Sequence, residues 1–73
     1  MPVDWAMTQE NIGLAFESMA RADPDNARAH LLDAEAAFAA ALDVYTPEHM
    51  AYYHDKATCA LARVRDKLAA LDA

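Results

Sequence analysis

Three histidines and one cysteine are the residues of this 73-residue chain best suited to metal binding or nucleophilic chemistry. Two metal ligands on one helix face stand three or four residues apart, as in H-E-x-x-H. His49 and His54 are five apart, and His30 belongs to a different stretch of the chain. The spacing therefore predicts surface histidines, with no metal site and no cofactor.

Cys59 is the only cysteine, and alanines surround it. We expect it to be a small buried apolar residue. The alternative is a reactive thiol, which would need positive charge nearby, and Lys56 and Arg63 lie about one turn to either side. Neither a G-x-S-x-G motif nor a phosphate-binding glycine loop occurs. The sequence therefore predicts a protein without catalytic residues, not an enzyme.

The net charge of −6 argues against nucleic acid and anionic membranes as partners. The charge is uneven, since residues 1–50 hold nine acids and two bases whereas residues 51–73 hold three acids and four bases. Such a distribution could attract a second copy, or it could reflect ordinary solvated helix faces. No apolar run has the roughly 18–20 residues of a membrane span. With no basic, apolar leader at the N-terminus, we expect a cytoplasmic protein.

Two breaks divide the sequence into three helical stretches. The first is Ala-Asp-Pro-Asp-Asn at residues 22–26, and the second is Thr-Pro-Glu at 46–48, typical of an N-cap followed by a first-turn proline. The sequence predicts helices over about 3–21, 26–45 and 47–71. Short connections favour antiparallel packing of consecutive helices. We expect residues 1–73 to form a single all-α domain.

Each predicted helix carries apolar residues at alternating steps of three and four. The stripes are Trp5, Thr8, Ile12, Ala15 and Met19 with Phe16; Ala27, Leu31, Ala34, Phe38, Ala41 and Tyr45 with Leu42; and Tyr53, Ala57, Leu61, Val64, Leu68 and Leu71. The predicted core or interface residues are Trp5, Ile12, Phe16, Phe38, Leu42, Tyr53, Leu61, Val64 and Leu68.

Two stretches resemble the tetratricopeptide repeat, whose helices follow W-x2-L-G-x2-Y and A-x3-F. Gln9-x2-Ile12-Gly13-x2-Phe16 resembles the first pattern, and Ala34-x3-Phe38 resembles the second, with a proline at position 47 closing the unit. Residues 4–15 and 34–42 also resemble a longer bacterial variant of the repeat. The resemblance covers residues 2–47. The third helix departs from the pattern and resembles a terminal capping helix.

The resemblance implies a helical hairpin that binds another protein or a peptide without catalysing a reaction. In this family the first helix of each repeat lines the binding surface, which corresponds here to Met7, Glu10, Leu14 and Glu17. Two apolar and two acidic side chains would suit a segment with apolar and basic residues. Alternatively, Met7 and Leu14 pack against a neighbouring repeat or a second subunit.

One and a half repeats are fewer than the three or so that bury a continuous core. The chain is therefore either a fragment of a longer array or a protein that completes its core by self-association. In both cases we expect a homo-oligomer, with a dimer favoured. Two alternative functions remain at this point: a purely structural homodimeric helical bundle, and a bundle that binds a metal or small molecule.

Overall fold

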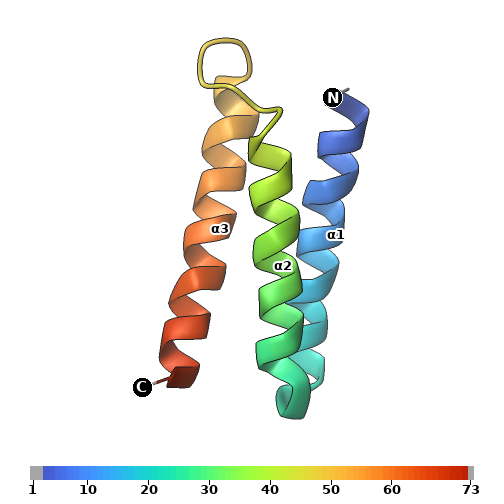
Figure 1. Cartoon of the computed structure of the whole chain (residues 1–73), viewed down its shortest axis with the longest axis vertical. Coiled ribbons are helices and arrows are strands. Elements are labelled where there is room, and N and C mark those ends of the chain that lie inside the picture. Colours follow the sequence, from blue (N-terminus) through green and yellow to red (C-terminus); the bar gives the residue numbers. More distant parts are fainter. Residues whose placement is uncertain (1–2, 73) are drawn as a thin grey trace.

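Three helices make up nearly all of residues 3–72, the part of the chain that the computed structural model describes. They are α1 (Val3–Ala22), α2 (Ala27–Leu42) and α3 (Ala51–Asp72), with one 3-10 turn, η1 (Pro24–Asn26), before α2. In Figure 1, α2 runs antiparallel to both neighbours, so that α1 and α3 run in the same direction. Within residues 3–72 there is no strand, and the prediction of an all-α, three-helix fold is confirmed.

The break between α1 and α2 lies where the sequence predicts it. The Asp23 N–H donates to the carbonyl of Met19 at 2.8 Å, which closes the last turn of α1. Pro24 follows and has no N–H with which to continue the helical hydrogen bonds. One 3-10 turn then reverses the chain into α2.

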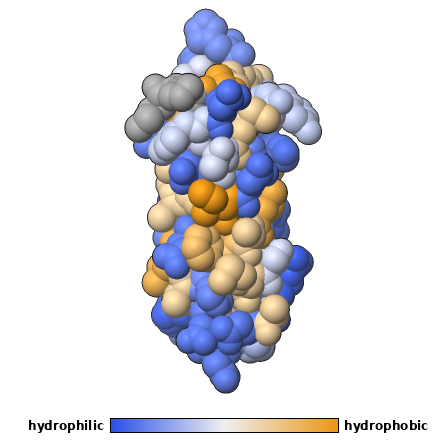
Figure 2. All heavy atoms as spheres, turned by 90° about the vertical axis from the view of Figure 1, so that its right-hand side faces the viewer, coloured by the Kyte–Doolittle hydropathy of each residue, from blue (hydrophilic) through white to orange (hydrophobic). Residues whose placement is uncertain are grey.

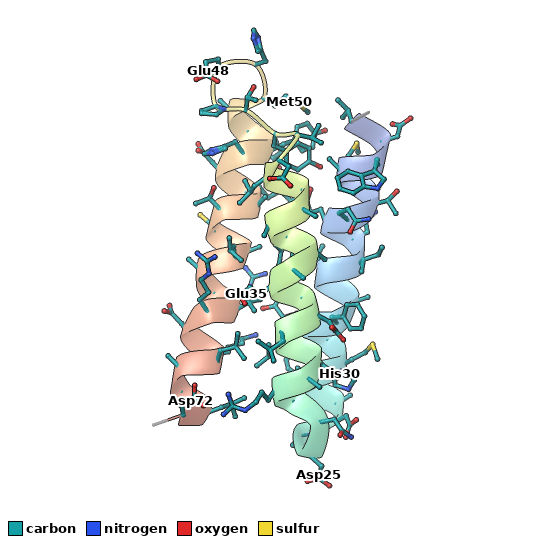
Figure 3. The ribbon with its side chains drawn as sticks, viewed as in Figure 1. Asp25, His30, Glu35, Glu48, Met50 and Asp72 are labelled. Atoms are coloured by element: carbon teal, nitrogen blue, oxygen red, sulfur yellow. The ribbon has the colours of Figure 1, made fainter. Side chains whose placement is uncertain are left out.

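The connection between α2 and α3 is longer than predicted. α2 ends at Leu42 and α3 begins at Ala51, so the predicted boundaries near 45 and 47 are wrong. The Met50 N–H donates to the Thr46 carbonyl at 2.8 Å, which makes a separate turn outside α3. Tyr45 is 1% exposed and Met50 packs against the same apolar cluster, so burial of these two side chains accompanies the early end of α2. Figure 3 shows the loop between them, with Glu48 on it.

Apolar side chains from all three helices form the core in two clusters along the bundle. The first contains Ala20, Leu31, Ala34, Phe38, Ala60, Leu61 and Val64, with Phe16, Ala27, Leu42 and Leu68 at its edge. The second contains Ala6, Ala41, Tyr45 and Ala57, with Trp5, Leu42, Val44, Met50 and Tyr53 at its edge. The predicted stripes of the second and third helices are therefore confirmed, except that Leu71 is exposed.

A close contact between α1 and α2 joins Gly13 to the ring of Phe38. Phe38 is completely buried, and a Cβ built on Gly13 would lie 2.8 Å from two atoms of its ring. A side chain at position 13 would therefore overlap the ring. The absence of a side chain at Gly13 therefore allows α2 to come close to α1.

The predicted stripe of α1 lies on the wrong face. Its buried residues are Ala6, Glu10, Gly13, Glu17 and Ala20. Ile12, predicted as a core or interface residue, is not part of the core of the chain, since it is 37% exposed, and Met19 is 44% exposed. Small residues let α2 pack closely on this face, and the two glutamates have partners on α3. Trp5 and Phe16 lie between the two faces and are partly buried at the edges of the clusters.

Candidate functional site

Glu17 of α1 is the centre of an ion-pair network with α3. Its side chain is 6% exposed, and its two carboxylate oxygens accept hydrogen bonds from Arg63 Nε at 2.5 Å and Arg63 Nη2 at 2.7 Å. The ammonium group of Lys67 donates a third, at 2.8 Å. The hydrogen bond from Arg63, with that from Lys67, lowers the pKa of Glu17 to about 2, although burial acts in the opposite direction.

Glu10, two turns earlier on α1, makes a second connection to α3. The ammonium group of Lys56 lies 3.1 Å from Glu10 Oε2, and the Tyr45 hydroxyl donates to Oε1 at 3.1 Å. Burial, together with this hydrogen bond to Glu10, raises the pKa of Tyr45 to about 12. The hydrogen bond to Glu10 also raises the pKa of Lys56. One buried carboxylate thus joins α1 to α3 and to the loop after α2.

The four residues predicted to bind a partner fall into two pairs. Glu10 and Glu17 are each 5% exposed and bound within the chain, so they are not the free acidic groups that recognition of a basic segment requires. Met7 and Leu14 are 38% and 39% exposed, and their role in binding stays a prediction. The sequence contained a signal for the pairing of these glutamates with α3. Glu10 and Glu17 are seven residues apart, and so are their partners Lys56 and Arg63.

The outward side of α1 is free of charge over most of its length. Glu10 and Glu17 are the only charged residues between Asp4 and Arg21, and both are buried. The exposed large apolar residues of α1 are Val3, Met7, Ile12, Leu14 and Met19. Figure 2 shows the side of the molecule that α1 forms, with apolar side chains gathered midway and hydrophilic ones toward both ends. We call the exposed residues from Asp4 to Arg21 the outer face of α1.

Exposed charged residues are concentrated on α3 and in the first half of α2. On α3 the exposed charged residues are Asp55, Lys56, Arg63, Arg65, Asp66 and Asp72. Arg65 pairs with Glu35 of α2 at 3.0 Å, and Arg28 of α2 pairs with Asp72 near the opposite end of the bundle from the 43–50 loop. Exposed helices of a monomer normally carry such charges on the solvent side. α3 follows this rule, whereas α1 has no exposed charge between Asp4 and Arg21 and α2 has no charged residue after Glu35.

Residues considered for metal binding or catalysis are dispersed. Cys59 is exposed, so the prediction that it is buried is wrong; it lies on the side of α3 away from Ala57, Leu61 and Val64. His30 Nε2 lies 3.2 Å from Asp23 Oδ2, which brings together two potential metal ligands but not three. Residues 3–72 contain no group of three His, Cys, Asp or Glu side chains placed to share a metal ion, and no cavity.

None of the helices described is both long enough and apolar enough to span a bilayer. Comparison of the chain with protein-family models, with curated proteins and with solved structures finds no significant match.

Proposed function

We propose that this chain is a non-catalytic protein–protein interaction module of the tetratricopeptide type, which binds its partner through the outer face of α1. The observation that carries this proposal is the exterior of α1, which has no exposed charge between its ends and where Met7 and Leu14 on one flank, and Ile12 and Met19 on the other, remain 37–44% exposed. Large apolar side chains that stay exposed on a helix are typical of surfaces that pack against another protein.

The arrangement of the helices supports the assignment to the repeat type. α1 and α2 form an antiparallel hairpin with a glycine–aromatic contact between Gly13 and Phe38. α3 runs parallel to α1, which is the position of the first helix of a following repeat. Its charged exterior suits a capping helix, because a terminal repeat must face water.

Site-specific photo-crosslinking tests the function. A benzophenone amino acid replaces Met7 on α1 in one variant and Leu32 on α2 in the control; both natural side chains are exposed and apolar. We expect protein adducts from position 7 and few from position 32. Binding of the purified partner should then saturate, and it should be weakened by Leu14→Lys but not by Leu32→Lys. Absence of any protein adduct at position 7 above the control would overturn the proposal.

A further inference from the structure

Six residues along the outer face of α1 form one continuous stripe. They are Asp4, Met7, Asn11, Leu14, Ser18 and Arg21, all exposed. Their spacing alternates between three and four residues, the heptad spacing that keeps side chains on one side of a helix packed against another helix. The stripe has an acid at one end and a base at the other, with uncharged residues between them. We call it the outer stripe of α1.

We infer that the outer stripe of α1 binds the same stripe of a second copy of the chain, in antiparallel orientation about a two-fold axis. This inference rests on the proposed function and names its partner. The stripe is symmetric in spacing about a point between Ile12 and Gly13, so an antiparallel pair forms six layers. Asp4 of one copy faces Arg21 of the other at both ends, Met7 faces Ser18, and Asn11 faces Leu14.

The charges at the two ends of the outer stripe favour an antiparallel orientation of the two helices and a second copy of the chain as the partner. A parallel pair would place Asp4 against Asp4 and Arg21 against Arg21, and facing like charges disfavour that arrangement. A basic peptide would need free carboxylates, but Glu10 and Glu17 are already bound to Lys56, Arg63 and Lys67. The outer stripe has no net charge and is complementary to itself, which favours a second copy.

The size of the stripe sets the strength of the dimer. A helix of 20 residues is about 30 Å long. One such helix buries less than the roughly 800 Å² per partner that is typical of stable complexes. We therefore expect a reversible dimer with a dissociation constant in the micromolar range, on the order of 10–100 μM.

Sedimentation equilibrium across that concentration range, on the full chain and two matched variants, tests the surface. Leu14→Lys places a charge in the middle of the stripe, and Leu32→Lys places the same charge on α2, where the leucine is 48% exposed. Both leucines are exposed, so both variants should fold, which circular dichroism verifies. The wild type and Leu32→Lys should dimerise, and Leu14→Lys should remain monomeric. A monomeric wild type, or a dimer weakened only by Leu32→Lys, would overturn the inference.

Charge reversal tests the orientation. Asp4→Arg and Arg21→Glu each create two like-charge contacts in the antiparallel dimer, and each should raise the dissociation constant about tenfold. The double variant restores both opposite-charge contacts and should dimerise more strongly than either single variant. Mixing the two single variants should produce a heterodimer stronger than either homodimer. Equal dimerisation of all variants, or a double variant weaker than both single variants, would overturn the antiparallel pairing.

The outcomes separate this inference from the proposed function. Adducts at position 7 that contain a different protein, with a monomeric wild type in sedimentation, would support the interaction module and contradict the homodimer. Adducts made only of two copies of the chain, together with the expected results of charge reversal, would support both the interaction module and the homodimer. The absence of both an adduct at position 7 and a dimer would contradict the interaction module and the homodimer alike.

Discussion

The guanidinium group of Arg63 on α3 binds both carboxylate oxygens of Glu17 on α1, through Nε at 2.5 Å and Nη2 at 2.7 Å. This two-point contact is the strongest polar connection between the two parallel helices, because both partners are ionised and the geometry is bidentate. The carboxylate is almost completely buried, whereas the arginine side chain is 47% exposed. The pair therefore holds α3 against α1 at a place where α1 has few large side chains to bury.

Replacement of Glu17 tests how much this contact contributes. Glu17→Gln should lower the free energy of unfolding by about 1–2 kcal/mol, because Arg63 and Lys67 lose their counter-charge but remain partly hydrated. The matched control is Glu35→Gln, which breaks the more exposed pair with Arg65 and should cost less than about 1 kcal/mol. Urea denaturation measures both. Equal losses in the two variants would contradict the special role of Glu17.

Stability should also fall with acid. The pKa of Glu17 is lowered from 4.5 to about 2 in the folded chain, so the folded state binds fewer protons than the unfolded state between these values. This contribution is fully present above pH 4.5 and is lost as pH falls toward 2. Because the paired bases are partly exposed, we expect a loss of about 1–2 kcal/mol from Glu17.

Urea denaturation at several pH values between 2 and 6 measures this effect. Glu17→Gln removes the titrating group and should flatten the decline below pH 4.5 relative to the wild type. Asp23 and Asp72, whose pKa values are also lowered by their hydrogen-bond partners, remain in the variant and leave a residual slope. Parallel curves for the two proteins would contradict the assignment to Glu17.

The exposure of Cys59 predicts ready reaction with thiol reagents. The folded chain should react with a disulfide reagent at a rate within about twofold of the chain unfolded in urea, because Cys59 is an exposed residue. Since Cys59 is the only cysteine, the whole signal comes from this thiol. Protection by tenfold or more in the folded chain would show that the side chain is covered, for example in a dimer.

Repeating the thiol reaction at protein concentrations well above and well below the dimer dissociation constant distinguishes a thiol covered by a second chain from a thiol covered within one chain. Protection that appears only at high concentration would place Cys59 in an interface. Protection at all concentrations would contradict the structure of α3.

The sequence predicted the buried faces of α2 and α3 well because each includes large apolar residues at helical spacing among its alanines. Leu31 and Phe38 on α2 are seven residues apart, and Leu61 and Val64 on α3 are three apart, so periodicity identifies the face that packs inward. Cys59 could have been placed outside by the same reasoning, since it falls between the positions of that stripe. Its alanine neighbours suggested burial, but composition does not define a face.

The sequence mispredicted α1 because small and charged residues form its buried face. Periodicity assigned Ile12 inward, but Gly13 admits the Phe38 ring and thereby turns Ile12 toward solvent. Glu10 and Glu17 are buried only because α3 runs parallel to α1 in a register that brings Lys56 and Arg63 opposite them. That register depends on the tertiary arrangement, so local pattern could not show which carboxylates are free to bind a partner.

Gly13→Ala provides the sharpest test of the packing that sets this face. Alanine normally stabilises a helix relative to glycine by about 1 kcal/mol. Here its Cβ would lie 2.8 Å from the buried Phe38 ring, and overpacking should cost about 1–3 kcal/mol. The overlap therefore outweighs or cancels the helix-propensity gain, and we expect a net destabilisation of about 0–2 kcal/mol, measured by urea denaturation.

The control is the same substitution in a Phe38→Leu background, which removes the ring atoms nearest position 13. Gly13→Ala should there be neutral or stabilising, because the overlap is gone while the gain in helix propensity remains. The difference between the two backgrounds is the coupling free energy of the contact, and it should exceed about 1 kcal/mol. The same effect of Gly13→Ala in both backgrounds would mean that the glycine does not set the approach of α2, and the outward position of Ile12 would then need a different cause.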